Sequence, residues 1–138
     1  MSLRNKHIFI VDDNALNRAT YQLILFAKGA YVGFDRWGRD TVKLLQRARN
    51  IDLIILDLML PMGASGYNLF TLIRQMPGYE TTPIIAVSAS DPYSAMEKCR
   101  EMGFSGYIAK PINEELFPDQ LARVIQGEQV WAAVRSGT

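Results

Sequence analysis

Polar residues able to bind phosphate or a metal ion stand at the ends of four short apolar runs in this sequence. They are Asp12 and Asp13, Asp57, Ser88 and Lys110. If the runs are parallel strands of one sheet, their carboxyl ends meet at a single edge, where open α/β sheets bind ligands. Three carboxylates, a hydroxyl and an ammonium group at one edge predict a magnesium-assisted phosphoryl site.

The three carboxylates indicate a divalent cation. Asp12 and Asp13 follow the run over residues 6–11 and Asp57 follows the run over residues 51–56, so these acids come close together and repel one another. Mg²⁺ relieves this repulsion, needs few carboxylates and accepts a phosphate oxygen as a ligand. Aspartate also caps loops at strand ends. For Asp13 alone that interpretation is the better one, but three acids facing Ser88 and Lys110 favour the metal site.

Asp57 is the best candidate for a phosphoryl acceptor because it stands alone at the end of a buried central run. A carboxylate that accepts a phosphoryl group becomes an acyl phosphate. The Ser88 hydroxyl and the Lys110 ammonium would meet the phosphoryl oxygens as charge develops on them. Lys110 precedes Pro111, and a cis bond between them would direct the ammonium inward. Ala89 is small and leaves room for a donor.

Short apolar runs alternate with longer amphipathic stretches along the chain. The predicted strands cover residues 6–11, 30–34, 51–56, 83–87 and 105–109. The predicted helices cover residues 14–28, 40–49 (or from 38), 67–75, 92–102 and 113–126. Five strands alternating with five helices predict an α/β fold with a doubly wound parallel sheet and right-handed crossovers.

Helical spacing predicts which side chains of the first helix face the sheet. The predicted inward stripe is Thr20, Leu23, Ile24 and Ala27. Pro118 falls inside the last predicted helix, where it either lies in the first turn or kinks the helix.

Composition limits the class of protein. The 138 residues suffice for one domain, 1–127, followed by a tail, 128–138, that is too short for a DNA-binding module. The net charge of +1, without a dense Lys/Arg cluster, predicts no direct nucleic-acid binding. The sequence has one cysteine, Cys99, which excludes an intramolecular disulfide and fits a reducing compartment. No segment reaches the ~20 apolar residues of a membrane span, so we expect a cytoplasmic protein without membrane contacts.

In order and spacing, the motifs of this chain resemble those of the receiver domain of bacterial two-component response regulators. The matching residues are Asp12-Asp13, Asp57 with Pro61 four residues later, Ser88-Ala89, Tyr107 and Lys110-Pro111-Ile112. The resemblance covers residues 6–126. It implies a flavodoxin-like five-stranded sheet in strand order 2-1-3-4-5, as in chemotaxis regulators.

The resemblance also implies a phosphorylation reaction. A sensor histidine kinase or a phosphotransfer protein would donate a phosphoryl group to Asp57. The side chains of Asp12, Asp13 and Asp57 and the backbone carbonyl of Met59 would bind Mg²⁺. The loop over residues 62–66 is one residue longer than is usual in this family, which affects the expected docking of the kinase and not the chemistry.

A conformational switch is the expected output. Ser88 would turn toward the phosphoryl group and Tyr107 would move inward with it. Without the resemblance, Tyr107 would be interpreted as an aromatic residue of a strand, in the core or half exposed. The fourth helix, fifth strand and fifth helix would then signal to an effector that stays open, or form a homodimer. Further apolar residues on the first helix are Tyr21, Leu25 and Phe26. We interpret them as partly buried, because scattered exposed apolar residues are normal. The alternative hypothesis is that they form a contact patch for the helical bundle of the kinase or for a second copy of the chain.

Other classes of protein compete with this interpretation. A haloacid dehalogenase-like phosphatase would carry an acid two residues after Asp57, where this chain has Met59. A flavin carrier would need a Ser/Thr/Gly-rich phosphate loop after the first strand. A degenerate receiver would lack residues that are present here. The chain can also be a receiver fragment of a larger hybrid kinase or transcription regulator.

Overall fold

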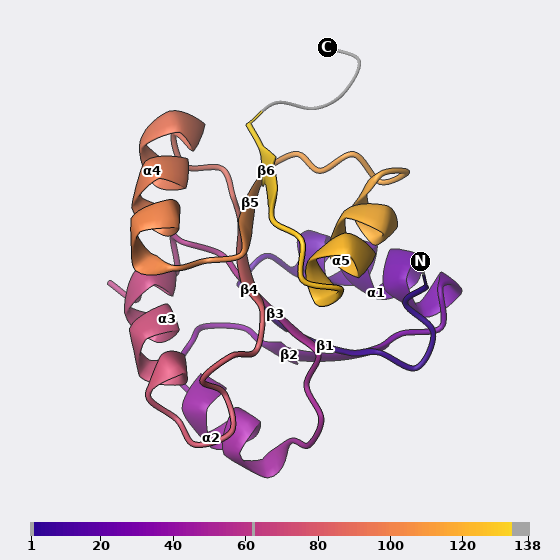
Figure 1. Cartoon of the computed structure of the whole chain (residues 1–138), viewed down its shortest axis with the longest axis horizontal. Helices are drawn as coiled ribbons and strands as arrows, with labels where there is room; N and C mark the ends of the chain where they lie inside the picture. The colour runs from indigo at the N-terminus through magenta and orange to yellow at the C-terminus, as the bar shows by residue number, and fades with distance from the viewer. Residues whose placement is uncertain (1, 62, 134–138) are drawn as a thin grey trace.

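One parallel sheet lies at the centre of the fold, and its first five strands are the apolar runs of the sequence (Figure 1). This computed structural model describes residues 2–61 and 63–133. Its strands are β1 (His7–Val11), β2 (Tyr31–Asp35), β3 (Leu53–Leu56), β4 (Ile84–Ser88), β5 (Gly106–Ala109) and β6 (Val130–Ala132). Every residue of β3 and β4 is buried, because helices cover both faces of central parallel strands.

The described strands follow the order β2-β1-β3-β4-β5-β6, and all neighbours pair in parallel. The predicted doubly wound parallel sheet is therefore confirmed, with the expected order of the first five strands. The predicted number of five strands is wrong, because residues 130–132, expected in the tail, form β6 against β5. Three residues are too few to show a strand period in the sequence. The sheet thus continues past residue 127, and residues 134–138 lie outside the described residues.

The helices among the described residues are α1 (Ala15–Ala27), α2 (Thr41–Arg47), α3 (Gly66–Arg74), α4 (Pro92–Met102) and α5 (Phe117–Ile125). Helix α4 has the predicted bounds because its signals are local. The side chain of Asp91 accepts the N–H of Ser94, and Gly103 ends the helix at a φ of 100°. Helix α5 begins four residues later than predicted, and Pro118 lies in its first turn, where no N–H is needed.

Two apolar layers hold the sheet between the helices. Helices α1 and α5 cover one face, while α2, α3 and α4 cover the other (Figure 1). Stacked rings join elements within each layer: Tyr21 on Phe117 at 5.6 Å, and Phe70 on Phe104 at 4.2 Å between ring centroids. Because the interior is packed on both faces, the carboxyl ends of the central strands are rigid supports for functional side chains.

The predicted inward face of α1 is wrong for Leu23 and Ala27, which are exposed, while Ile24 packs against the core as predicted. Tyr21 and Leu25 point into the core, whereas Leu23 is 74% and Phe26 is 73% exposed. Apolar residues lie on both sides of this helix, so spacing alone does not tell which side meets the sheet. With Leu16, which is 75% exposed, Leu23 and Phe26 form an apolar outer face of α1.

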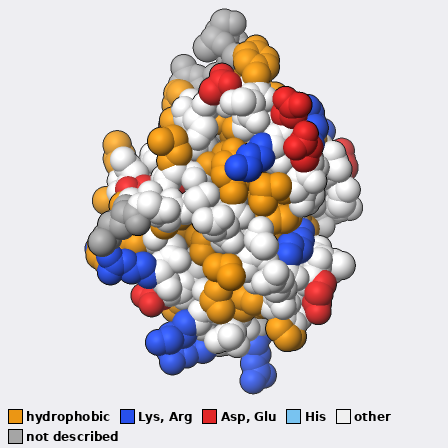
Figure 2. Space-filling model, turned by 90° about the vertical axis from the view of Figure 1, so that its left-hand side faces the viewer, with side chains coloured by type: hydrophobic (Ala, Val, Ile, Leu, Met, Phe, Trp, Pro, Cys, Tyr) orange, Lys and Arg blue, Asp and Glu red, His pale blue; other side chains and the backbone are white. Residues whose placement is uncertain are grey.

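Figure 2 shows the side of the molecule formed by the helices at the left of Figure 1. Hydrophobic side chains gather near its centre, with Lys, Arg, Asp and Glu side chains around them. Leu72 of α3 and Tyr93 of α4 are among the exposed large apolar residues of these helices. Among the described residues, no helix has both the length and the apolar character needed to cross a membrane.

Candidate functional site

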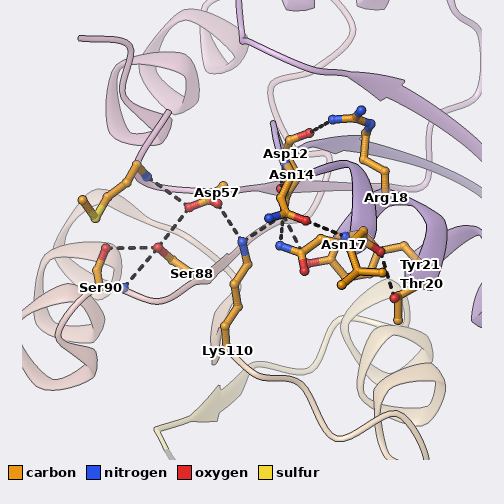
Figure 3. A network of polar contacts seen from close by, with 12 residues as sticks. Asp12, Asn14, Asn17, Arg18, Thr20, Tyr21, Asp57, Ser88, Ser90 and Lys110 are labelled. Carbon is orange, nitrogen blue, oxygen red and sulfur yellow. Dashed lines mark hydrogen bonds and ion pairs between the residues drawn. The ribbon is translucent and has the colours of Figure 1, made fainter. Parts of the chain in front are cut away.

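The carboxyl edge of the sheet brings together residues that are up to 98 positions apart in the sequence (Figure 3). Asp12 follows β1, Asp57 follows β3, Ser88 ends β4 and Lys110 follows β5. These strands are neighbours in the sheet, so four of the five polar residues predicted at this edge meet in one hydrogen-bonded cluster. The fifth, Asp13, lies beside them with its carboxylate exposed.

Lys110 joins the two buried carboxylates. Its Nζ donates to Oδ2 of Asp12 at 2.9 Å and to Oδ2 of Asp57 at 2.7 Å. Asp12 is 1% exposed and Asp57 is 7% exposed. Burial by itself lowers the pKa of the Lys110 ammonium, but the hydrogen bonds and negative charges of Asp57 and Asp12 outweigh it, and the pKa is raised. The Lys110-Pro111 bond is cis, the isomer that the sequence hypothesis considered.

The second carboxylate oxygen of Asp57 is held by neutral donors. Oδ1 accepts the hydroxyl of Ser88 at 3.1 Å and the backbone N–H of Met59 at 3.1 Å. The Ser90 hydroxyl lies 3.0 Å from the Ser88 hydroxyl, on the side away from Lys110 (Figure 3). Asp57 therefore lies between a cation on one oxygen and a hydroxyl on the other, and both groups also suit phosphoryl oxygens.

Asp12 is fixed by the first turns of α1. Its Oδ1 accepts the N–H of Asn14 at 2.9 Å, and its Oδ2 accepts Nδ2 of Asn17 at 3.5 Å and the Tyr21 hydroxyl at 3.4 Å. Burial, and after it the charges of Asp12 and Asp57, raise the pKa of Tyr21 far above its usual value. Sequence reasoning missed Asn17 and Tyr21. Their spacing of five and nine residues from Asp12, on a helix that starts directly after it, was the available signal.

The three aspartates fit a cation. One carboxylate oxygen from each of Asp12, Asp13 and Asp57 lies within 4.8 Å of the other two. Met59 faces Ser65 in an isolated bridge whose hydrogen bonds come from the flanking residues: the N–H of Leu60 donates to Ala64, and the carbonyl of Leu58 accepts from residue 66. The carbonyl of Met59 is thus not used by this bridge. Hard oxygen donors in this number match the preference of Mg²⁺.

Tyr107 reaches the site through the backbone. It is completely buried on β5, and its hydroxyl donates to the carbonyls of Ser88 at 3.2 Å and Ser90 at 3.0 Å. Burial, followed by the nearby Cys99, raises the pKa of Tyr107 to about 12. The interpretation as a core aromatic fits its burial, and its hydroxyl adds a contact with the segment that carries Ser88.

One buried acid near this edge was not a candidate and has a structural role. Asp35 ends β2, and its Oδ2 accepts the Thr41 hydroxyl at 2.6 Å and the Asp40 N–H at 3.1 Å. Asp40 itself makes no side-chain cap, so Asp35 supports the start of α2 in its place.

A groove opens beside Lys110. It has a volume of about 380 Å³ and is lined by Leu16, Asn17, Thr20, Tyr21, Ala89, Lys110, Pro111, Ile112 and Glu114. Its walls are the first half of α1 and the loops after β4 and β5. The small side chain of Ala89 lines this groove together with Lys110, one of the residues of the polar cluster.

Comparison with known proteins gives a consistent family. The model of the response regulator receiver domain matches residues 8–122. The signal transduction histidine-protein kinase BarA of Escherichia coli K12 is 33% identical over 129 residues, which cover 92% of this chain and 14% of BarA. The chain spans between 12% and 15% of the length of the histidine kinases that it matches first.

Solved structures agree with this match. The receiver domain of sensor histidine kinase PA1611 from Pseudomonas aeruginosa, with a magnesium ion in its active site cleft, superposes with a TM-score of 0.78 and 29% identity, over 89% of this chain and 99% of that one. Chemotaxis response regulator CheY4 of Vibrio cholerae gives a TM-score of 0.79 and 27% identity, over 87% and 98% of the two chains.

Proposed function

Because this chain belongs to the response regulator receiver domain family, we propose that Asp57 accepts a phosphoryl group from the phosphohistidine of a sensor histidine kinase or phosphotransfer protein. The observation that carries this proposal is the pair of contacts on Asp57, with the Lys110 ammonium at 2.7 Å from one oxygen and the Ser88 hydroxyl at 3.1 Å from the other. A haloacid dehalogenase-like phosphatase has no support from these relatives, and Met59 stands where it would carry an acid.

The reaction is a transfer between two nucleophiles. A carboxylate oxygen of Asp57 forms a bond to phosphorus while the bond from phosphorus to the donor's imidazole nitrogen breaks. The imidazole leaves with the electron pair of that bond and takes up a proton. The product is an acyl phosphate, whose extra negative charge needs compensation at the carboxyl edge.

Residues of this chain supply that compensation. The Lys110 ammonium exchanges its contact with the Asp57 carboxylate for one with a phosphoryl oxygen, and the Ser88 hydroxyl does the same on the other side. Asp12 holds Lys110 in place during this exchange. Asp12, Asp13, Asp57 and the carbonyl of Met59 would hold Mg²⁺, which when bound neutralises charge on the phosphoryl oxygens. Ser88 and Tyr107 then act as the switch residues of the phosphorylated state.

The donor docks on the outer face of α1. Leu16, Leu23 and Phe26 are each about three-quarters exposed, lie at helical spacing on this face and continue into the groove beside Lys110. A helix that carries the phosphohistidine would bury these side chains and bring the imidazole toward Asp57. Tyr21 and Leu25, which the sequence hypothesis included in this patch, are buried and do not take part.

Other properties of the proposed module follow from the same residues. Hydrolysis returns Asp57 to its free form, so the domain catalyses its own phosphorylation and dephosphorylation and no other reaction. We place it in the cytoplasm, where ATP supplies the kinase. We also propose one receiver domain that extends through β6 instead of ending at residue 127. A homodimer through α4, β5 and α5 would have to accommodate β6, which pairs with β5.

The test is phosphorylation by a small donor. Wild type and Asp57→Asn are incubated with acetyl phosphate and Mg²⁺, and intact mass is measured with time. We expect a phosphoryl adduct on wild type that is absent from the variant and is lost when Mg²⁺ is chelated beforehand. An adduct on both proteins would remove Asp57 from the assigned role.

A further inference from the structure

Strand β6 occupies the edge of β5. It lies beside β5 at the end of the sheet (Figure 1). The two strands pair in parallel register, with Gly106 opposite Val130, Tyr107 opposite Trp131 and Ile108 opposite Ala132. The N–H of Val130 donates to the carbonyl of Ser105 at 3.2 Å. Val130 is buried in the layer of α1 and α5, while Trp131 packs against the layer of α2, α3 and α4. Strand β6 is therefore held on both faces of the sheet as well as through its backbone.

The sequence of β5 is matched to this strand. A Cβ atom added at Gly106 would collide with the backbone carbonyl oxygen of Val130. Backbone cannot give way as a flexible side chain can, so a residue larger than glycine at position 106 is incompatible with β6 at its observed distance. Gly106 has no other need for glycine, since its φ is not positive. Its lack of a side chain is explained by the close approach of β6.

Trp131 is positioned against the same face as Tyr107. The two residues are register partners on adjacent strands, and both contact the apolar layer that includes α4. The guanidinium carbon of Arg100 on α4 lies 4.5 Å from the centroid of the Trp131 ring. This cation–π contact ties α4 to β6. The indole N–H donates to Gln129 at 3.1 Å and fixes the ring further.

A continuous series of contacts leads from β6 to the phosphoacceptor. Trp131 neighbours Tyr107, and the Tyr107 hydroxyl donates to the carbonyls of Ser88 and Ser90. The Ser88 hydroxyl donates to Asp57. With β6 in place, an outward movement of Tyr107 toward α4 meets Trp131 and Arg100. The strand thus favours the buried position of Tyr107, in which the segment with Ser88 is held against Asp57.

We propose that the edge of β5 and the flank of α4 form a strand-binding surface whose occupant is β6 of the same chain, and that its occupancy is coupled to phosphorylation of Asp57. This proposal rests on the proposed function of Asp57. A second copy or a foreign strand is the less favourable occupant, because β6 is joined to α5 by only residues 126–129 and is already in register. The turn includes Gly127, whose φ of 103° directs the chain back along β5.

Coupling of this kind is reciprocal. If docked β6 favours the arrangement of Ser88 that binds the phosphoryl group on Asp57, then that phosphoryl group must favour docked β6 by the same factor. We expect a factor of about five or more, the lower end of measured couplings between sites.

The experiment uses the full chain with Trp37→Phe, which leaves Trp131 as its one tryptophan. In this background, Gly106→Ala displaces β6 while all residues of the site stay unchanged. Gly33→Ala is the matched control, the same substitution in β2 at the opposite edge, where the added Cβ meets a Phe9 side-chain atom at 3.3 Å and no backbone. Trp131 emission is recorded before and after addition of beryllofluoride with Mg²⁺, a mimic of the acyl phosphate. The phosphorylation rate with acetyl phosphate is measured by intact mass.

The proposal predicts that Trp131 emission of the Gly106→Ala variant is red-shifted, and that beryllofluoride with Mg²⁺ moves it back toward the wild-type position. It also predicts slower phosphorylation than in Gly33→Ala, and a beryllofluoride affinity that is about five-fold or more weaker. Asp57→Asn removes the response of the emission, which a purely structural strand would never show. If Gly106→Ala does not fold, Trp131→Gln is compared by phosphorylation rate with Trp37→Phe.

The outcomes separate the two proposals. The coupling is refuted, and the proposed role of Asp57 stands, if wild type forms the adduct but Gly106→Ala and Gly33→Ala are phosphorylated at equal rates. The same conclusion follows if wild type forms the adduct and the Trp131 emission does not respond to beryllofluoride. A dimer that appears with Gly106→Ala and binds β6 in trans overturns the assignment of the occupant. Absence of any adduct on wild type overturns the proposed function, and the coupling falls with it.

Discussion

Lys110→Met removes the cation that separates two buried carboxylates. In the wild type, Nζ lies 2.9 Å from Asp12 and 2.7 Å from Asp57, and the Lys110 side chain is 17% exposed. Methionine has a similar length and fills the same space, so the change is mainly one of charge. The variant leaves carboxylates whose oxygens approach within 4.8 Å of one another without their shared partner.

The size of the effect follows from the geometry. Two unit charges at that distance repel by about 3.5 kcal/mol at an effective dielectric constant of about 20. Loss of one partner from a buried ion pair costs roughly 3–5 kcal/mol in other proteins. We expect the free energy of unfolding of Lys110→Met to fall by about 3 kcal/mol without Mg²⁺. Saturation with Mg²⁺ at 100 times its dissociation constant should restore about 2.7 kcal/mol.

Urea unfolding followed by circular dichroism measures both values, once with a chelator and once with Mg²⁺. The control is Lys43→Met, which removes an exposed lysine from α2 and should change stability by no more than about 0.5 kcal/mol. Phosphorylation of Lys110→Met by acetyl phosphate should be slower by roughly 10²–10³, the usual cost of one oxyanion donor. Equal stability of the two variants under both conditions would refute the electrostatic account of the site.

Further outcomes follow from the same site. Asp13→Asn should stabilise the metal-free domain by about 1 kcal/mol, because it removes the repulsion between an exposed carboxylate and the other two carboxylates at about 4.8 Å. The same variant should bind Mg²⁺ more weakly in a calorimetric titration. A lower free energy of unfolding of Asp13→Asn without Mg²⁺ would contradict this prediction. Gly66→Ala should cost about 1–3 kcal/mol in urea unfolding and slow phosphorylation, because the new Cβ collides with the carbonyl oxygen of Asp57. The raised pKa of Lys110 means that its charge stabilises the fold fully below pH 10.5 and less as pH rises above that value. The difference in free energy of unfolding between wild type and Lys110→Met should therefore decrease only above pH 10.5. A difference that disappears near neutral pH would be inconsistent with a raised pKa of Lys110.

The sequence by itself determined the features that depend on neighbours along the chain. Helix α4 has its predicted bounds because Asp91, Pro92 and Gly103 act within one turn of its ends. The central strands were predictable because continuous apolar runs are characteristic of parallel strands buried on both faces. The polar residues that end these runs could be assigned to one edge because parallel strands align their carboxyl ends.

Only the tertiary structure decided which atoms meet and which faces are covered. The choice of Tyr21 and Leu25 over Leu23 for the core depends on how α1 lies against the sheet, and both sets satisfy helical spacing. The contact of Lys110 with Asp12 joins residues 98 positions apart, so no local pattern encodes its geometry. Strand β6 is too short to have a period of its own. It forms because Gly106 leaves space at the edge of β5, and because Val130 and Trp131 pack against the apolar layers on the two faces of the sheet. Only the folded sheet provides these contacts.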